Sequence, residues 1–165
     1  MLHADLAPPP TKSAATAARR RAGSPSYLDL YRASALERIS LIRQGIPAGE
    51  AKRLFADLPM AQGAGFKALS LSTATVNRKA AQNERLSPEE SERVIGLARL
   101  IGQVEAMVAE SGTPAGFDAR AWIARWLSEP LPALGGLCPG ALIDTMEGQG
   151  LVSAALAQLT SGAYA

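Results

Sequence analysis

The sequence is poor in the residue types that most catalytic and metal sites require. Its only histidine, His3, lies in the first few residues, and its only cysteine is Cys138. One histidine in a terminal segment supplies neither a zinc site nor a catalytic triad, and a lone cysteine excludes an internal disulfide bond. The acidic residues fall at helix caps and exposed helical positions, where stability and solubility explain them. We therefore expect no enzyme activity, no metal and no cofactor.

Long apolar runs are also missing, although 47% of the 165 residues are hydrophobic. No run approaches the ~18 residues that a membrane-spanning helix needs. The start of the chain lacks the apolar core that follows a basic segment in a secretory signal. A single cysteine is typical of a reducing compartment, and we expect Cys138 to be a small buried hydrophobic side chain. These absences predict a soluble cytoplasmic protein with no membrane partner.

Charge is unevenly distributed along the chain. Residues 1–86 contain 13 Lys and Arg against 6 Asp and Glu, a net charge of +7, whereas residues 87–165 contain 4 against 9, a net charge of −5. This asymmetry indicates two different partners, of which the first would be a polyanion. A solvated basic face with no role in nucleic-acid binding is the alternative for the first half.

The segment from Ser87 to Ser111 has the clearest helical signal in the chain. Ser87 and Glu90 have the spacing of a capping box, and Pro88 stands at the first helical position, where its missing N–H costs nothing. Apolar residues recur at steps of three and four and form one broad face, made of Val94, Ile95, Leu97, Ala98, Leu100, Ile101, Val104, Met107 and Val108. Because so broad a face has to be covered on more than one side, we expect the rest of the fold to be built on this helix.

The chain before this helix divides into an arm and a helical region. Residues 1–24 contain three consecutive prolines and three consecutive arginines, with too little apolar content to pack, which indicates a mobile basic arm. Apolar positions between Ser26 and Gln44 follow helical steps, and Pro47 opens a second helix that ends at Pro59. No segment has the strict alternation of a strand, so we predict an all-α fold.

Residues 61–84 have the pattern of a helix-turn-helix. A short helix would carry Phe66 and Leu69, a turn would follow at residues 70–72, and Ser72 would cap a second helix with Val76 facing inward. The second helix would present polar side chains to a DNA major groove, namely Ser72, Thr73, Thr75, Asn77, Arg78 and Lys79. An ordinary helical hairpin with a solvated polar face is the alternative.

A glycine-rich stretch in the same region formally matches a dinucleotide-binding fingerprint. Gly63, Gly65 and Ala68 stand at the required spacing. However, no strand signal precedes them, and no acidic residue follows about 20 positions on in a βαβ context. We therefore interpret the stretch as part of the first helix of the helix-turn-helix, in which each glycine weakens the helix by up to ~1 kcal/mol.

Beyond the long helix, the sequence predicts a helix, a tight turn and two more helices. The first helix begins near Phe117 and has an aromatic and aliphatic face made of Trp122, Ile123, Trp126 and Leu127, a pattern more often found in a core than on a binding surface. Residues 134–140 make the turn, and Pro139 opens a short helix that Gly148 interrupts. The apolar face of the last helix consists of Leu151, Val152, Ala155, Leu156 and Leu159.

Taken in order, these features resemble the antitoxins in which an Xre-like helix-turn-helix is followed by an Xre/MbcA/ParS toxin-binding domain. The resemblance covers roughly residues 45–162. It departs from the family pattern at Leu137-Cys138 in the turn and at Gln62 to Gly65 in the helix-turn-helix. It is carried by Leu69 to Ser72 with Thr75, Val76 and Arg78, by Arg85 to Arg93, by Ala121-Trp122 and Trp126-Leu127, by Leu134-Gly135-Gly136 with Pro139, and by Asp144-Thr145 with Gly148, Val152 and Leu156.

The resemblance implies an antitoxin of a bacterial type II toxin–antitoxin system. Its partner would be a RES-domain toxin, which resembles ADP-ribosyltransferases and consumes NAD or transfers its ADP-ribose to a cellular protein. The antitoxin would block that active site and would bind operator DNA to regulate its own operon, as a homodimer within a toxin–antitoxin hetero-oligomer. Residues 1–24 would be an arm, 25–86 an Xre-like helix-turn-helix domain and 87–165 a toxin-binding domain. The alternative is a stand-alone helix-turn-helix transcriptional regulator whose C-terminal domain dimerises or senses a ligand.

The residues expected to contact the toxin lie in the acidic C-terminal half, whose charge would speed encounter with a pocket that binds an anionic dinucleotide. One hypothesis places the last helix and the tail at the pocket mouth, with Tyr164 stacking and the terminal carboxylate of Ala165 meeting an arginine. A second assigns the block to Asp144, Glu147 and the Gly-Gly turn, and a frayed tail that touches nothing is the alternative to the first. The complete set of expected contacts is Trp122, Trp126, Leu134, Gly135, Gly136, Pro139, Asp144, Thr145, Glu147, Tyr164 and Ala165.

Overall fold

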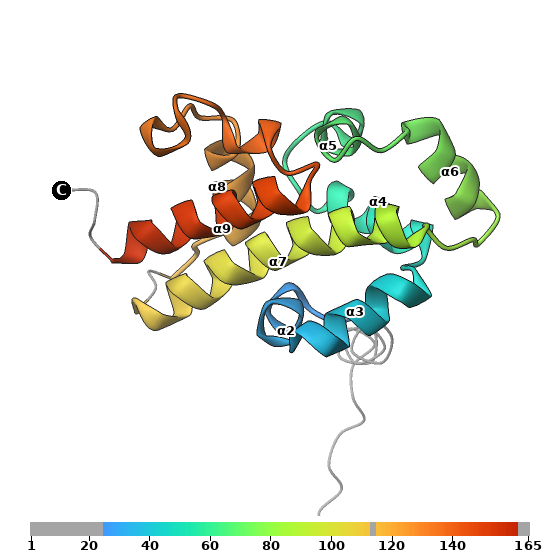
Figure 1. The fold of residues 1–165 in the computed structure, drawn as a ribbon, viewed down its shortest axis with the longest axis horizontal. Coiled ribbons are helices and arrows are strands. Elements are labelled where there is room, and N and C mark those ends of the chain that lie inside the picture. The colour runs from blue at the N-terminus through green and yellow to red at the C-terminus, as the bar shows by residue number, and fades with distance from the viewer. Residues whose placement is uncertain (1–24, 113–114, 162–165) are drawn as a thin grey trace, which may run out of the picture.

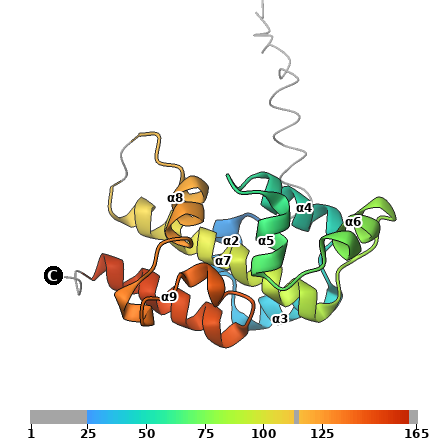
Figure 2. The same cartoon turned by 90° about the horizontal axis from the view of Figure 1, so that it is seen from above.

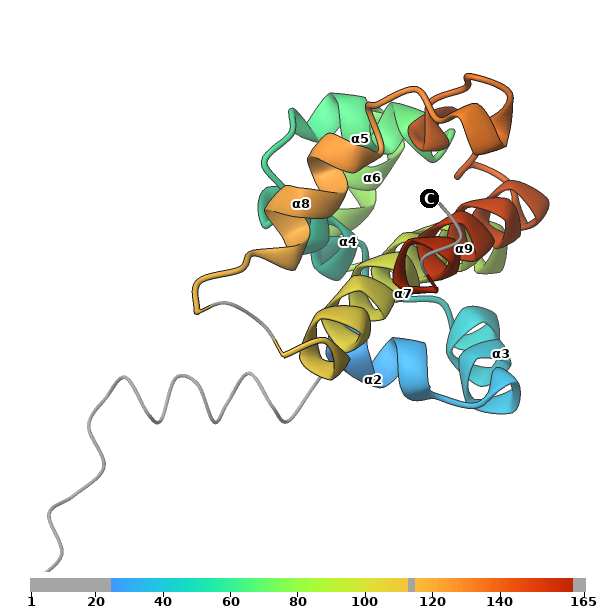
Figure 3. The ribbon, with the colours of Figure 1, turned by 90° about the vertical axis from the view of Figure 1, so that its left-hand side faces the viewer.

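The long helix predicted from its capping box runs through the middle of the molecule. In the computed structural model, which describes residues 25–112 and 115–161, this helix is α7 (Pro88–Glu110), and the other helices surround it (Figures 1 and 3). The Glu90 carboxylate accepts a hydrogen bond from the Ser87 amide at 2.8 Å, and the Ser87 hydroxyl accepts one from the Glu90 amide at 3.1 Å. Most side chains between Val94 and Ala106 are buried, so α7 forms the centre of the core.

The all-α prediction is confirmed for the described residues, in which no strand forms. Two isolated bridges join Pro47 to Arg85 and Leu131 to Leu137. The expected basic arm, residues 1–24, lies outside the described part of the chain. In chain order the other elements are α2 (Tyr27–Arg32), α3 (Ala35–Gln44), α4 (Ala48–Ala56), α5 (Gln62–Ala68), α6 (Thr73–Ala81), α8 (Ala119–Trp126), the 3-10 turns η1 (Pro132–Leu134) and η2 (Pro139–Ala141), and α9 (Met146–Thr160).

One predicted helix is in fact two. The apolar steps between residues 26 and 44 suggested a continuous helix, but the chain breaks at Ala33 and Ser34 to give α2 and α3. Ala33 is extended, and Ser34 starts α3 through a second capping box, in which the Glu37 carboxylate accepts from the Ser34 amide at 2.7 Å. The break therefore has a local cause, because the cap satisfies the first amides of a new helix.

α2 and α3 lie together on one side of α7 (Figure 3). α2 approaches closely at Gly102, where a Cβ atom would overlap the backbone of Tyr27 and crowd the side chain of Tyr31. A glycine is needed there because any side chain would separate the two helices. Beyond the end of α3, the amide of Ile46 donates to the Ser91 hydroxyl of α7 at 2.9 Å. This hydrogen bond attaches the C-terminal end of the α2–α3 pair to α7.

α5 and α6 form the predicted helix-turn-helix, and together with α4 they lie beside the N-terminal end of α7 (Figures 1 and 2). The rings of Phe55 in α4 and Phe66 in α5 meet edge to face, with centroids 4.5 Å apart. Leu69 and Val76 are completely buried between these helices. The predicted short helix, turn and Ser72-capped second helix are thus confirmed.

The last helix, α9, returns alongside α7 (Figures 1 and 3). The Ser153 hydroxyl of α9 donates to the Gln103 side chain of α7 at 2.7 Å, and the Gln103 amide group donates back to the Ser153 carbonyl at 2.9 Å. The buried Gln149 amide group donates to the carbonyls of Ile143, at 2.9 Å, and Arg93, at 3.2 Å. Buried hydrogen bonds of this kind fix the register of α9 on α7.

Gly148 does not interrupt a helix, contrary to the prediction. The helix expected from Pro139 is only the 3-10 turn η2, and α9 begins at Met146 with Thr145 as its N-cap. Gly148 lies in the first turn of α9, where a Cβ atom would overlap the carbonyl oxygen of Leu142. The glycine is there because the preceding turn packs directly on the helix, which requires the absence of a side chain.

α7 is shared by both halves of the molecule. The buried residues of α4–α6 and those of α8 and α9 join one continuous hydrophobic core, to which α7 contributes throughout its length. The division into residues 25–86 and 87–165 stays a prediction. Within the part of the chain that the structure describes, no helix is both long and apolar enough to cross a bilayer.

Candidate functional site

The structure exposes Ser72 and Arg78 and leaves the other polar residues that the sequence singled out in α6 half-buried. The Ser72 hydroxyl caps the helix by accepting from the Thr75 amide at 3.3 Å, and Thr73 and Thr75 are half-buried. Arg78 is exposed, and its guanidinium donates to the side chains of Gln82 and Glu84 at 3.0 and 3.4 Å. These weak surface contacts leave Arg78 available to a phosphate or a base edge.

Lys79 does not face outward, contrary to the prediction. Its ammonium group contacts the Glu90 carboxylate of α7 at 2.7 Å, and most of both side chains is covered. Burial alone would raise the pKa of Glu90, but the hydrogen bonds from Lys79 and from the Ser87 amide hold it below its usual value. Lys79 therefore fastens α6 to α7, because the end of α6 meets the first turn of α7. Asn77 is half-buried, and its side-chain oxygen has no hydrogen-bond partner among the described residues.

The glycine-rich stretch 62–65 belongs to α5, as the sequence indicated. A Cβ atom at Gly65 would overlap the ring of Phe55, whereas one at Gly63 would only make ordinary van der Waals contact with the Thr73 hydroxyl oxygen, at 4.0 Å. A glycine is thus required at position 65 so that the Phe55 ring can pack against the Phe66 ring. No strand precedes it, so the described residues do not form the strand-turn-helix that a dinucleotide fingerprint requires.

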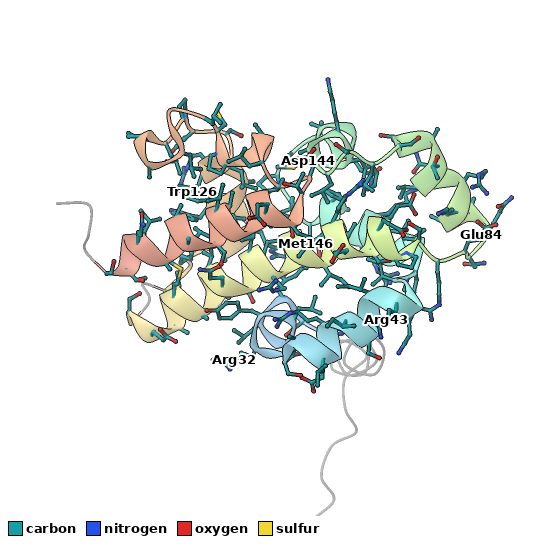
Figure 4. The ribbon with its side chains drawn as sticks, viewed as in Figure 1. Arg32, Arg43, Glu84, Trp126, Asp144 and Met146 are labelled. Carbon is teal, nitrogen blue, oxygen red and sulfur yellow. The ribbon has the colours of Figure 1, made fainter. Side chains whose placement is uncertain are left out.

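The turn between α5 and α6 is held by residues from outside the helix-turn-helix. Ser70 has a φ of 51°, which is in the left-handed region. Its hydroxyl donates to the Asp144 carboxylate at 3.1 Å, and its carbonyl accepts from the Arg93 guanidinium at 3.2 Å. Asp144, expected only as a toxin contact, therefore lies between the helix-turn-helix and α9 (Figure 4).

Large apolar side chains are exposed around α9. We define the C-terminal apolar surface as Leu137, Met146, Leu151 and Leu159, which are 52%, 45%, 54% and 41% exposed. The sequence missed Leu137 and Met146 and expected Leu151 and Leu159 to help form a core face. A sequence signal for exposed apolar side chains was nevertheless present, because α9 has one carboxylate, no lysine or arginine, and apolar residues on all sides. A helix that is apolar all round is normally covered by protein.

Two of the expected contact residues are buried instead. Trp126, in α8, is 6% exposed, and Pro139 is also buried. Trp122 is half-buried and stacks on Trp126, with ring centroids 5.7 Å apart. Consecutive turns of α8 bring the two rings together, and both side chains pack with the hydrophobic core. Trp126 and Pro139 therefore act through packing.

The loop that precedes α9 is exposed at its glycines. Gly135 and Gly136 have φ values of 66° and 83°, a conformation that side chains rarely adopt, and no neighbouring atoms crowd either residue. The Gly136 amide donates to the Leu131 carbonyl at 2.9 Å, which closes the loop, and Leu134 is half-buried within it. Cys138 is half-buried and not fully buried as expected, and its thiol donates to the Ser128 carbonyl at 3.3 Å.

The remaining expected contacts that the structure describes, Thr145 and Glu147, lie at the start of α9. The Thr145 hydroxyl accepts from the Gly148 amide at 3.0 Å, and Glu147 is exposed in the first turn. Tyr164 and Ala165 lie outside the described residues. The start of α9 therefore presents the exposed Glu147 carboxylate next to the exposed side chain of Met146.

A shallow cleft lined by residues of α2, α7 and the start of α8 was not predicted from the sequence. It is lined by Tyr27, Glu105, Phe117, Asp118 and Arg120. Burial, with the nearby Asp57 carboxylate, raises the pKa of Tyr27 to about 12, and burial also raises the pKa of Glu105. Among the described residues, no group of three His, Cys, Asp or Glu side chains is arranged to hold a metal ion.

Comparisons with known proteins match both halves of the chain. Residues 37–99 match the antitoxin Xre-like helix-turn-helix domain, and residues 115–162 match the antitoxin Xre/MbcA/ParS C-terminal toxin-binding domain. The chain is also similar to the Prs ADP-ribosylating antitoxin of Sphingobium sp. (strain YBL2), at 57% identity over 140 residues, which cover 85% of this chain and 88% of that protein. The first match ends inside α7 and the second begins after it, so α7 joins the two matched regions.

Proposed function

The chain belongs to the antitoxins that join an Xre-like helix-turn-helix domain to an Xre/MbcA/ParS toxin-binding domain, and from this premise we propose that it silences an ADP-ribosylating RES-domain toxin by covering that enzyme's NAD-binding cleft. The relative from Sphingobium, an antitoxin named for ADP-ribosylation, supports this class of partner. In this proposal the antitoxin performs no catalysis. It acts in the cytoplasm, where both NAD and operator DNA are available.

The C-terminal apolar surface is the observation that carries the proposal. Leu137 and Leu151 are each more than half exposed, in a region matched by a toxin-binding domain. Burying a leucine side chain contributes roughly 1.5–3 kcal/mol, so a few such residues supply most of the energy of a tight interface. We propose that this surface docks against the rim of the toxin's cleft.

The net charge of the C-terminal half also supports docking of this surface against the toxin's cleft. Residues 87–165 carry a net charge of −5, and α9 has a carboxylate at Glu147 and no basic residue. A cleft that binds the phosphates of NAD is expected to be basic, and opposite charges speed association and orient the partners. The block itself would come from the loop at Gly135 and Gly136 or from residues 162–165, with Tyr164 stacking and the Ala165 carboxylate paired to an arginine.

Substitutions on the C-terminal apolar surface test the docking proposal. We expect Leu151→Asp to weaken toxin binding at least about tenfold and to restore toxicity on co-expression, because a charge would replace a buried apolar anchor. Leu36→Asp is the matched control, since Leu36 is 79% exposed and belongs to α3, a helix on the other side of α7 from α9 (Figure 1). If the Leu151 variant, expressed at the wild-type level, neutralised the toxin fully, the proposal that this surface docks against the toxin would be refuted.

Deletion of residues 162–165 separates the two blocking mechanisms. If the tail fills the cleft, the shortened chain still binds the toxin but no longer prevents NAD consumption. If the Gly135-Gly136 loop fills it, the shortened chain inhibits normally, and lengthening the loop by one residue relieves inhibition. Binding and NAD consumption are measured on the same purified complexes.

We also propose that α6 reads operator DNA and represses the antitoxin's own operon, with two copies of the chain in the toxin complex placing two readers on paired half-sites. The exposed Arg78, the threonines Thr73 and Thr75 and the capping Ser72 would make the contacts. Lys79 is left out of this set because its ammonium group is paired with the Glu90 carboxylate.

The DNA proposal is tested by operator binding at several salt concentrations. We expect Arg78→Ala to weaken operator binding by roughly 1 kcal/mol or more and to reduce the salt dependence. Arg32→Ala is the control, because Arg32 is exposed on α2 at the opposite edge of the molecule from α6 (Figure 4). Equal affinity of the wild type and the Arg78 variant at every salt concentration would contradict a reading role for α6.

A further inference from the structure

One half-buried arginine in the middle of α7 has no acidic partner among the described residues. Arg99 lies in the stretch of α7 whose other side chains are mostly buried and apolar. Its Nε atom is buried and has no hydrogen-bond partner in the part of the chain that the structure describes. A guanidinium N–H that is buried without a partner costs free energy, because it loses its hydrogen bonds to water. The stability of the free chain therefore does not explain Arg99.

A second arginine lies near Arg99. The Arg38 guanidinium is held at the end of α2, where it donates to the carbonyls of Leu30 and Ala33. Burial and the nearby charge of Arg38 lower the pKa of Arg99, whereas Tyr31 raises it. None of the ion pairs that the described residues form includes either arginine. Two like charges are thus close together with no carboxylate of the described residues to compensate them.

Two other half-buried charged residues of α7 do have partners. The Glu90 carboxylate contacts the Lys79 ammonium group at 2.7 Å, and the Arg93 guanidinium donates to the Ser70 carbonyl at 3.2 Å. Half-buried charges in proteins are normally compensated in this way. The contrast indicates that the partner of Arg99 is supplied from outside the described part of the chain.

Arg99 lies on the part of α7 between α9 and the α2–α3 pair. Gly102, three residues further on, packs against Tyr31 of α2, and Gln103, four residues further on, is hydrogen-bonded to Ser153 of α9. Residues three and four apart in a helix share a face. α9 and the α2–α3 pair lie on different sides of α7 (Figure 3). Because α9 carries most of the C-terminal apolar surface, a partner that covers this surface also reaches Arg99.

Operator DNA is less well placed to supply the missing anion. α6 is fastened to the first turn of α7 by the Lys79–Glu90 ion pair. Arg99 lies nine residues beyond Glu90, which is roughly 14 Å along the helix at ~1.5 Å per residue. A phosphate on the outside of a duplex would also have to approach a half-buried side chain, whereas a protein can extend a single acidic side chain. The position of Arg99 therefore favours the protein partner.

We propose that Arg99 and Arg38 form a binding site for one carboxylate of the toxin, carried by an aspartate or glutamate side chain that enters between α9 and the α2–α3 pair. The planar guanidinium group can donate two parallel hydrogen bonds to a carboxylate, and the negative charge offsets the repulsion between the two arginines. Within a C-terminal half of net charge −5, this positive site sets the orientation of the docked toxin. The inference rests on the proposed function, because it assumes a toxin partner.

Arg99→Met has opposite effects on the free antitoxin and on its toxin complex. In the free antitoxin it raises the melting temperature by roughly 2–4 °C, because it removes an unpaired charge and keeps an apolar stem. It weakens toxin binding at least about tenfold, because the toxin carboxylate is left without its partner. Arg99→Lys, which keeps the charge but not the planar fork, has an intermediate affinity for the toxin. Thermal unfolding and calorimetric titration of the full-length chain measure the two effects.

Arg43→Met is the matched control. Arg43 is an exposed arginine of α3, and its loss changes the net charge of the antitoxin by the same amount as the loss of Arg99. Its replacement leaves the melting temperature and the toxin affinity unchanged, because an exposed charge contributes little. The comparison separates a specific carboxylate site from a general effect of charge on association.

Four results would overturn the carboxylate site. Equal toxin affinity of wild type and Arg99→Met would show that no toxin carboxylate reaches Arg99, and a lower melting temperature of the free variant would make Arg99 a structural residue. Loss of operator affinity in place of toxin affinity would assign the site to a DNA phosphate. If Arg99→Met lowered the melting temperature only in a chain that retains residues 162–165, the anion would be the chain's own terminal carboxylate.

The wild-type antitoxin separates failure of this site from failure of the proposed function. If the wild type binds and neutralises the toxin while any of these four results is obtained, only the carboxylate site is wrong. If the wild type neither binds nor neutralises the toxin, the proposed function is wrong as well.

Discussion

Lys79 and Glu90 form an ion pair 2.7 Å long that fastens the last turn of α6 to the first turn of α7. Glu90 simultaneously closes the capping box of α7 by accepting from the Ser87 amide at 2.8 Å. One carboxylate therefore starts the central helix and anchors the helix assigned to DNA reading. This double use explains why a residue expected on the DNA surface is mostly covered.

Removing the ion pair is expected to destabilise the fold in a pH-dependent way. Lys79→Met keeps the apolar stem and should lower the free energy of unfolding by about 1 kcal/mol at neutral pH, because Glu90 loses a partner. The lowered pKa of Glu90 means that its contribution is present above the ordinary value of 4.5 and is lost as the pH falls through the folded-state pKa. Urea unfolding at neutral and acidic pH measures both effects. A stability difference that does not shrink in acid would contradict the role of this pair.

Two glycines in α9 should respond to alanine in opposite ways. Gly148→Ala is expected to destabilise the protein by about 2 kcal/mol or more, because the new Cβ atom would overlap the Leu142 carbonyl. Gly150→Ala is the matched control in the same helix, where the space is open, and it should stabilise by roughly 0.5–1 kcal/mol. Thermal or urea unfolding of both variants checks the prediction. Similar effects at the two positions would refute the close packing at Gly148.

Glu105 should have the opposite pH behaviour to Glu90. Burial raises the pKa of Glu105, despite the nearby Arg120, so its charged form is disfavoured in the folded protein. Its presence therefore lowers stability above the folded-state pKa, and that penalty disappears as the pH falls toward 4.5. Glu105→Gln should raise the melting temperature at neutral pH and leave it unchanged in acid. Glu110→Gln, at an exposed position of the same helix, is the control, and equal shifts in both variants would disprove a burial effect.

The sequence predicted helices well where a start signal and an apolar face agreed. Ser87, Pro88 and Glu90 mark the start of α7, and the buried residues that follow confirm its face. The same capping spacing stands at Ser34 and Glu37, but the apolar positions continue in helical register across the break, so one helix was expected where there are two. Gly148 was misinterpreted because a glycine needed for packing has the same sequence signature as one that ends a helix.

The candidate functional surfaces were less predictable, because exposure depends on how helices meet. Periodicity placed Leu151 on an apolar face, but only the path of α9 over α7 shows that more than half of it is exposed. Trp126 was expected among the toxin contacts, but its neighbours cover it, in keeping with the core pattern of the aromatic face of α8. The Ser70–Asp144 contact joins positions 74 residues apart, a separation that no local pattern encodes.

NAD binding by the toxin is the most direct test of the central claim, that the C-terminal apolar surface seats the antitoxin over the toxin's NAD-binding cleft. Calorimetric titration of NAD is performed on the purified toxin, on its complex with the wild-type antitoxin and on a mixture with Leu151→Asp, using a catalytically inactive toxin so that NAD is not consumed. We expect binding by the free toxin, none by the wild-type complex and restored binding with the Leu151 variant. A wild-type complex that binds NAD as tightly as the free toxin would contradict this role of the surface.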